Sequence, residues 1–257
     1  MKIINIFNKR NTTLLYLIIV GELIFALPFH VSRFFRPGLI EDYNYNNLSL
    51  GISFSIYGFT ALICYVPGGY IADKIEPKYL LASSLLLTSL GGVVLLFNPT
   101  YSWLYFLYGY WGITTILFFW GALIKATRDI ANEKQGLSFG ALEGGRGLIA
   151  SLCASLAVFI YSNTLLNKTF SNILNKDISS LSLVILFYTF ITFFSSIMIF
   201  FFLQSEPIKK NIIRSNLLSK IIKNYKIILS IAMIVFTAYS GYKGIDYYSL
   251  YFYKILL

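Results

Sequence analysis

The chain has 257 residues, of which 57% are hydrophobic and 12% are charged, and its formal net charge is +10. About a quarter of the residues of a soluble globular domain are charged, so this composition excludes such a domain and indicates an integral membrane protein. The cations lie between apolar stretches and not beside aromatic residues on one soluble face, which argues against a nucleic-acid-binding domain.

Seven apolar stretches have the length of a membrane-spanning helix, which needs about 20 residues. They cover approximately residues 12–34, 48–72, 79–98, 102–124, 137–162, 180–203 and 225–252. Such runs do not alternate as the strands of a barrel do, so we expect an all-α polytopic protein. We predict three parts: a six-helix transmembrane bundle at 1–204, a basic cytoplasmic loop at 205–224, and a seventh transmembrane helix at 225–257 that begins a second, incomplete bundle.

The positions of lysine and arginine predict the orientation in the cytoplasmic (inner) membrane. With the N-terminus inside, four cations fall in outside loops: Arg33, Arg36, Lys168 and Lys176. Fourteen fall in inside segments: Lys2, Lys9, Arg10, Lys74, Lys78, Lys125, Arg128, Lys134, Lys209, Lys210, Arg214, Lys220, Lys223 and Lys226. This excess places the N-terminus in the cytoplasm and, after seven spans, the C-terminus outside.

Small residues and proline predict where the spans bend and pack. Pro28 is expected to bend span one just before His30. Gly136, Gly140 and Gly144 recur every four residues and line one face of span five, where a neighbouring backbone can approach closely. The two cysteines, Cys64 and Cys153, fall within spans, so we interpret them as buried apolar residues and not as a disulfide.

Charged residues inside the spans are the candidate functional residues, because charge at membrane depth is costly and marks sites of function. Glu143 with Arg146, and Lys243 with Asp246, are spaced so that each pair lies on one helix face. These four are candidate substrate-binding residues, since arginine and lysine suit a carboxylate or phosphate. The alternative is that each pair neutralises itself and only holds helices in register.

Span one carries two further candidates. Glu22 lies at mid-depth with no basic residue within helical reach, and burial favours its protonated form, so we predict that it carries a coupled proton. The alternative is a protonated glutamate that bonds to a neighbouring helix. Arg33, with His30 one turn earlier, is placed at the outer mouth, where it attracts an anionic solute or extends to the lipid headgroups.

The connection between spans two and three reads Gly69-Tyr-Ile-Ala-Asp73-Lys74-Ile-Glu-Pro-Lys78. It resembles the cytoplasmic loop motif of the major facilitator superfamily, Gly-x-Leu-Ala-Asp-Arg-x-Gly-Arg-Lys, at the same place in the topology. Glu76 replaces the second glycine of that motif and Pro77 a basic residue. The resemblance implies that Gly69, Asp73, Lys74 and Lys78 form a conformational switch, in which Asp73 ties helix ends together in one state. An ordinary turn is the alternative.

Two further segments resemble the sugar-phosphate or organic-anion permease branch of that superfamily. One runs from Tyr110 to Tyr161 and includes Trp120-Gly-Ala-Leu-Ile-Lys-Ala-Thr-Arg128, and the other is Gly241-Tyr-Lys243-Gly-Ile-Asp246-Tyr-Tyr. The resemblance implies secondary transport of a small polar, anionic solute by proton coupling or exchange. It also implies two six-helix bundles with the solute held between them.

Other functions were weighed. A truncated, non-transporting remnant, or a half-transporter that needs a partner chain, is the main alternative. A seven-helix retinal protein with Lys243 as Schiff base is a remote one, because span three has no counter-ion carboxylate. No catalytic triad, metal cluster or phosphate-binding glycine loop is present in the sequence, so we expect no enzyme and no cofactor. The expected partners are the lipid bilayer, a small anionic solute and a second half-transporter chain, with no nucleic acid.

Overall fold

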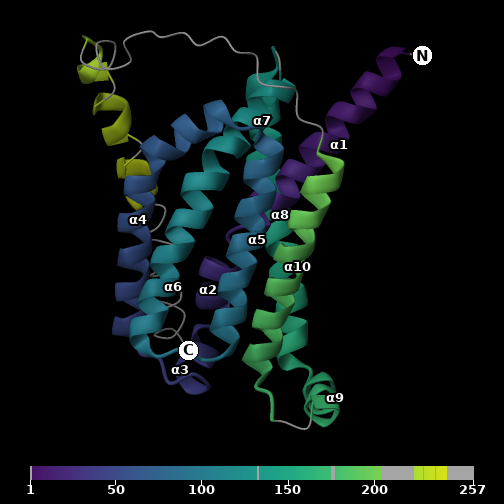
Figure 1. Ribbon diagram of the computed structural model, residues 1–257, viewed down its shortest axis with the longest axis vertical. Helices are drawn as coiled ribbons and strands as arrows, with labels where there is room; N and C mark the ends of the chain where they lie inside the picture. The colour runs from purple at the N-terminus through teal and green to yellow at the C-terminus, as the bar shows by residue number, and fades with distance from the viewer. Residues whose placement is uncertain are drawn as a thin grey trace. The chain divides into compact units, whose positions relative to one another are not determined.

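A computed structural model describes residues 2–131, 133–174, 177–203, 223–227, 229–234 and 236–241, with side chains from Asn11 onward. Residues Met1–Ile208 and Lys209–Leu257 form two separate compact units. The first is an all-helical bundle with six helices long and apolar enough to span a membrane, which confirms the expected fold class (Figure 1). In the second, the described parts of 225–241 are helical, and Lys243 and Asp246 lie outside the described residues.

The first span is built from several short elements. It runs over Asn11–Phe34 and contains α1 (Lys2–Leu23) from Asn11 onward, the π-helical turn η1 (Ala26–His30) and α2 (Val31–Phe34). Pro28 has no N–H to donate, and the wide turn around it is closed by Val31 N–H, which donates to the Ala26 carbonyl five residues back. The expected irregularity at Pro28 is therefore confirmed. A short helix, α3 (Arg36–Glu41), follows.

The next two spans form a helical hairpin. They are α4 (Asn47–Lys74) and α5 (Pro77–Leu96), joined by only Ile75 and Glu76. Asn46 begins α4 as a capping box, because its side chain accepts the Ser49 N–H at 2.7 Å. Burial of Tyr43 and Tyr45, in the connection before α4, raises the pKa of each phenol, so both remain donors at neutral pH.

The fourth span is one long run of three elements. These are α6 (Tyr101–Ile113), the π-helical η2 (Thr114–Trp120) and α7 (Gly121–Ala131). The helix continues seven residues beyond the expected end at 124, because Lys125 is used in packing: its Nζ donates to the Ala72 carbonyl at the end of α4, 2.6 Å away. A cation at the last carbonyls of a helix is favourable, so this charge belongs to the helix and not to a loop.

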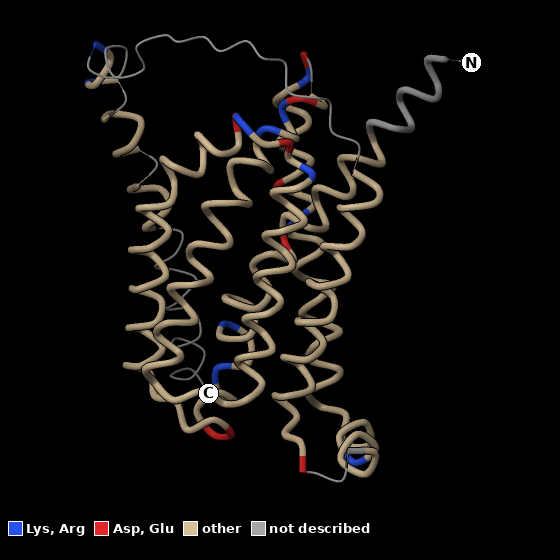
Figure 2. The backbone as a smooth tube through the Cα atoms, in the orientation of Figure 1, with Lys and Arg blue, Asp and Glu red and all other residues tan. Residues whose placement is uncertain are grey.

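The fifth and sixth spans are α8 (Gln135–Ser162) and α10 (Ser180–Phe202). Between them lies α9 (Thr164–Leu174), a short amphipathic helix that the sequence analysis did not predict. In the bundle α5 packs on α10, α4 on α6, and α1 on α8 (Figure 1). Charged residues gather mainly at the end of the bundle that holds the α4–α5 and α7–α8 connections (Figure 2).

Polar side chains fill the positions where the spans are irregular. Ser84 donates to the Thr114 carbonyl at the start of η2, 2.6 Å away, and Thr192 donates to the Leu23 carbonyl at the break in span one, 3.3 Å away. A membrane interior offers no water to satisfy such carbonyls, so neighbouring helices must supply the donors. These contacts hold the two irregular turns in place beside the charged residues described next.

Candidate functional site

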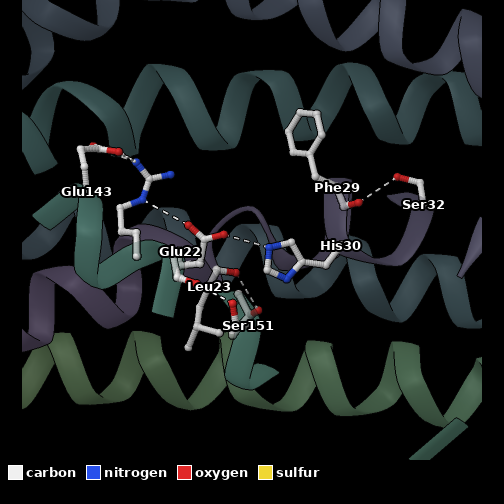
Figure 3. Close-up of polar contacts among 10 residues, drawn as sticks. Glu22, Leu23, Phe29, His30, Ser32, Glu143 and Ser151 are labelled. Atoms are coloured by element: carbon white, nitrogen blue, oxygen red, sulfur yellow. Dashed lines mark hydrogen bonds and ion pairs between the residues drawn. The ribbon is translucent and has the colours of Figure 1, made fainter. Parts of the chain in front are cut away.

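Four ionisable side chains from span one and α8 form a connected group, which we call the charged cluster: Glu22, His30, Glu143 and Arg146. His30 Nε2 lies 2.9 Å from Glu22 Oε1 (Figure 3). On the other carboxylate oxygen, Glu22 Oε2 lies 3.3 Å from Arg146 Nε. Glu22 therefore bridges an imidazole and a guanidinium, although no basic residue lies within regular helical reach of it along span one.

The π-helical turn explains why the sequence did not reveal the His30 contact. Residues eight apart in a regular helix are rotated by about 80° from each other, which puts them on different faces. The wide turn of η1 rotates less per residue and moves His30 back toward the face of Glu22. His30 is 5% exposed and bonded to Glu22, one turn before the exposed Arg33.

Arg146 is the centre of the charged cluster. Its Nη1 donates to both oxygens of Glu143, at 3.0 and 2.9 Å, which confirms the expected pairing along α8. Its Nε–H does not form a hydrogen bond with Glu22, because the contact at 3.3 Å is an ion pair with poor donor geometry. Arg146 thus holds Glu143 firmly and Glu22 loosely.

Two aromatic rings and a glycine shape the space around Arg146. Its Cζ lies 5.6 Å from the ring centroid of Phe25 and 5.5 Å from that of Trp120, both within cation–π range. Gly21 lets the arginine stem lie against span one, since a Cβ there would meet Arg146 Cδ at 3.3 Å. Phe25 and Trp120 adjoin η1 and η2, so both irregular turns border the cluster.

Exposure differs sharply within the charged cluster. The side chains of His30, Glu22 and Arg146 are 6%, 12% and 14% exposed, whereas that of Glu143 is 60% exposed. The cluster therefore opens along α8, and its charge is buried on the span-one side. With a neutral His30, two carboxylates face one guanidinium. The buried pair of Glu22 and Arg146 is neutral, and the second carboxylate, that of Glu143, is exposed.

The predicted conformational-switch residues lie at and beside the α4–α5 connection. None of them belongs to the charged cluster, which comes from span one and α8. Lys74 bonds to the Tyr70 hydroxyl and lies over that ring, and Lys78 lies 5.1 Å from the Phe200 ring centroid. The Asp73 side chain is exposed and forms no ion pair with the described residues. A Cβ on Gly69 would meet nothing within 4 Å. Their proposed switching role is not tested by this geometry.

The remaining sequence candidates are not brought to the charged cluster. Arg33 is exposed, and its Cζ lies 5.3 Å from the Phe34 ring near the end of span one. The glycine face of α8 does not pack within the bundle, because a Cβ on Gly136, Gly140 or Gly144 would meet nothing within 4 Å. Gly145, one residue off that face, packs against span one instead, since a Cβ there would come within 2.7 Å of Ile18. Among the described residues, no group of three metal-ligating side chains occurs.

Comparison with known proteins identifies a family. A model of the Major Facilitator Superfamily matches residues 18–256. The inner membrane protein YihN of Escherichia coli (strain K12) is 28% identical over 243 residues, which cover 90% of this chain and 54% of YihN. The inner membrane protein YqcE of the same strain is 28% identical over 199 residues, covering 77% of this chain and 44% of YqcE.

A third relative is the uncharacterized protein MG294 homolog of Mycoplasma pneumoniae, 27% identical over 164 residues, or 55% of this chain and 32% of the relative. This chain therefore spans about half the length of YihN and YqcE. No solved structure matches it.

Proposed function

This chain belongs to the Major Facilitator Superfamily of membrane transporters, and we propose that it forms the amino-terminal bundle of a secondary transporter for a small anionic solute. The resemblance of residues 110–161 to sugar-phosphate and organic-anion permeases supports that solute class. Family membership leaves the retinal-protein alternative without support. The names of YihN and YqcE place those proteins in the inner membrane, and we propose the same membrane for this chain.

Arg146 is the observation that carries the proposal. Its guanidinium is a planar donor that lies against the adjoining rings of Phe25 and Trp120, at the open side of α8, and its Nη2 has no bonding partner among the described residues. Arginine binds a carboxylate or phosphate through two parallel N–H donors, which suits an anionic solute. We propose that the solute binds Arg146 from this open side, with Glu143 as the carboxylate it displaces.

The charge balance of the cluster supports coupling to protons. An anion at Arg146 adds negative charge to a group that already holds two carboxylates and one guanidinium. Protonation of Glu22 removes one negative charge and releases its loose contact with Arg146. We therefore propose that the solute binds tightly only when Glu22 is protonated, which makes anion and proton move together. In the absence of a pH gradient the same site exchanges one anion for another.

A second bundle is part of the proposal, whichever polypeptide supplies it. Only 6% of the apolar window of α8 and 33% of that of α4 is buried, and the glycines on these helices leave open faces. Small residues let helices approach closely in a membrane. We propose that a second bundle, either a further segment of the protein or a partner chain, covers these faces and receives Asp73. Lys243, Asp246 and Arg33 remain proposed solute contacts.

The proposed orientation places the N-terminus and the α4–α5 and α7–α8 connections in the cytoplasm. Lys74, Lys78, Lys125, Arg128 and Lys134 lie at or near those connections, where the charged residues of Figure 2 gather. The opposite end holds fewer cations, as expected for the outer side. In this orientation His30 lies on the outer side of Glu22, and Arg146 on the inner side.

The test uses the full chain in proteoliposomes with three radiolabelled probes: glucose 6-phosphate, gluconate and inorganic phosphate. We expect one of them to accumulate under an imposed pH gradient, and Arg146→Gln to lower its uptake about 100-fold, the effect of removing a buried charge partner worth about 3 kcal/mol. Arg146→Lys keeps the charge but not the planar pair of donors, so its uptake should lie between that of the wild type and that of Arg146→Gln. Lys168→Gln, on exposed α9, removes a cation elsewhere and serves as the matched control. Unchanged uptake by Arg146→Gln would overturn the anion site.

Two further readouts separate the parts of the proposal. Glu22→Gln is expected to retain anion exchange but to lose accumulation driven by the pH gradient; accumulation by that variant contradicts the proton role of Glu22. Binding is followed separately through tryptophan fluorescence in a Trp103→Phe, Trp111→Phe background, which leaves Trp120, whose ring centroid lies 5.5 Å from Arg146 Cζ, as the single reporter. Anion binding without transport by the wild-type chain favours the half-transporter that needs a partner. If the wild-type chain neither binds nor transports any of the three probes, the proposed solute class is refuted.

A further inference from the structure

His30 is placed as a proton-transfer group and not as a structural one. It is 5% exposed, and its Nε2 lies 2.9 Å from Glu22 Oε1. A carboxylate partner accepts a hydrogen bond, so the neutral ring carries its proton on Nε2 and leaves Nδ1 as the basic nitrogen. Nδ1 is buried and has no hydrogen-bond partner. A buried imidazole that has a carboxylate on one nitrogen and a bare lone pair on the other is ready to accept a proton.

A second buried polar atom without a hydrogen-bond partner lies on the residue that packs against the His30 ring. From α10, Tyr188 is fully buried, its ring centroid lies 5.7 Å from that of His30, and its hydroxyl has no hydrogen-bond partner. Glu22 comes from α1, and Arg146 and Cys153 from α8. The stretch of α5 at 84–96, which also packs near η1, carries only serine and threonine as polar residues. Glu22 and Tyr188 are thus the proton-exchanging groups beside the ring.

We propose that His30 relays protons between the outer side and Glu22, with the Tyr188 hydroxyl as its neighbour on the α10 side. The inference rests on the proposed function, in which Glu22 carries the coupled proton. His30 Nδ1 takes a proton from the outer side, which gives an imidazolium. The proton on Nε2 then passes to Glu22 Oε1, leaving a neutral carboxylic acid and a neutral ring with its proton on Nδ1. The ring is reset when the proton leaves Nδ1 and Nε2 again carries one.

The position of the relay couples it to the anion site. Glu22 bonds to His30 through Oε1 and contacts Arg146 through Oε2. When the relay neutralises Glu22, the ion pair to Arg146 loses its charge, and the guanidinium becomes available to an anion. Proton entry and anion binding therefore act on the two oxygens of one carboxylate, and His30 controls the first without touching the solute.

The first test measures the ring directly and needs no substrate. The sequence contains a single histidine, so protein labelled with 15N-histidine gives signals from His30 alone. In lipid vesicles we expect the neutral ring to carry its proton on Nε2, and the ring to become doubly protonated reversibly when acid is added. In Glu22→Gln the preference for Nε2–H should weaken. A neutral ring protonated on Nδ1, or a ring that does not titrate, would overturn the relay.

The second test separates relay from solute binding in proteoliposomes. His30→Asn is expected to lower accumulation under a pH gradient by about 100-fold, the usual size of a lost acid–base group, while anion exchange stays close to wild type. Tyr188→Phe should lower accumulation less and also spare exchange. Tyr43→Phe is the control, because its hydroxyl contacts Ser182 at the outer end.

The outcomes distinguish this relay from the proposed function. If His30→Asn accumulates solute fully, the relay is refuted but the proposed function is not. If His30→Asn loses both exchange and accumulation, His30 has a structural role and the relay is also refuted. A wild-type chain that transports no probe refutes the solute class, while the ring measurement still decides the relay.

Discussion

Span four and span five have almost the same mean hydropathy, 1.4 and 1.5, but very different surroundings. In Tyr101–Ala131 61% of the apolar window is buried, whereas in Gln135–Ser162 only 6% is. Lipid tails are as apolar as leucine, so hydropathy reports that a helix spans the membrane but not what it touches. Of these two spans, the one that carries the proposed anion site has the smaller buried share within its own bundle.

The two spans also use polar groups differently. Span four places neutral polar groups in the core: Thr115 Oγ1 forms a hydrogen bond with Tyr57 Oη of α4 at 2.7 Å, and Trp111 Nε1 donates to the Thr88 carbonyl at 3.1 Å. Its cations, Lys125 and Arg128, occur only at its end. Span five places an ion pair, Glu143 with Arg146, inside its length. Neutral bonds fix the scaffold, and charges mark the side on which the proposed solute binds.

The largest expected contrast between these spans is in their glycines. A Cβ on Gly112 in α6 would contact Thr60 Oγ1 and would come within 2.8 Å of the Tyr57 carbonyl. Gly112→Leu should therefore cost about 3 kcal/mol of stability by overpacking the α4–α6 contact. The measurement is the thermal unfolding midpoint of the chain in mild detergent.

Gly144→Leu is the matched control, since a Cβ there would meet nothing within 4 Å. It should leave the unfolding midpoint unchanged or slightly higher, because leucine is the better helix former. If both substitutions lower the midpoint equally, the α8 face is covered by protein in detergent and the contrast between the spans is wrong.

A smaller effect is expected from the core hydrogen bonds. Thr115→Val keeps the shape but removes the partner of the Tyr57 hydroxyl. We expect a loss of about 1 kcal/mol, typical of hydrogen bonds inside membrane proteins. In α8, Ser155→Ala removes only a bond to the carbonyl of Ser151 in the same helix, on an exposed face, and should change the midpoint less. Equal losses would mean that both spans depend on polar contacts to the same degree.

The fold was largely predictable because membrane helices have a strong sequence signal. The six expected spans up to residue 203 all occur. Their ends differ from the expected ones mainly where a charged residue was taken as the end of a span. Lys125 ended the fourth apolar stretch in the sequence but caps α4 in the structure. The helix α9 was missed because at 11 residues it is too short for a spanning signal.

The candidate site was only partly predictable. The Glu143–Arg146 pair follows from helical spacing, which is a local rule. The contacts of Glu22 with His30 and Arg146 do not, because one depends on a π-helical turn and the other on two helices packing together. Pro28 indicated that span one is irregular, but a proline does not specify the direction of the change. The tertiary partners of a buried charge must therefore be seen in the structure.

The smallest expected effect lies where the two spans meet. Trp120, at the end of η2, places its ring 5.5 Å from Arg146 Cζ, so the buried span supplies a wall of the site on the open one. Trp120→Leu should weaken anion binding about threefold, since a cation–π contact of this kind contributes about 0.5 to 1 kcal/mol. Half-saturation of exchange by the transported probe measures this change. Trp103→Leu, on the exposed side of α6, removes an indole of the same span and should leave half-saturation unchanged. If both substitutions change half-saturation equally, Trp120 acts through folding. If only Trp120→Leu changes it, a side chain from the buried span four affects how strongly Arg146 of span five binds the anion.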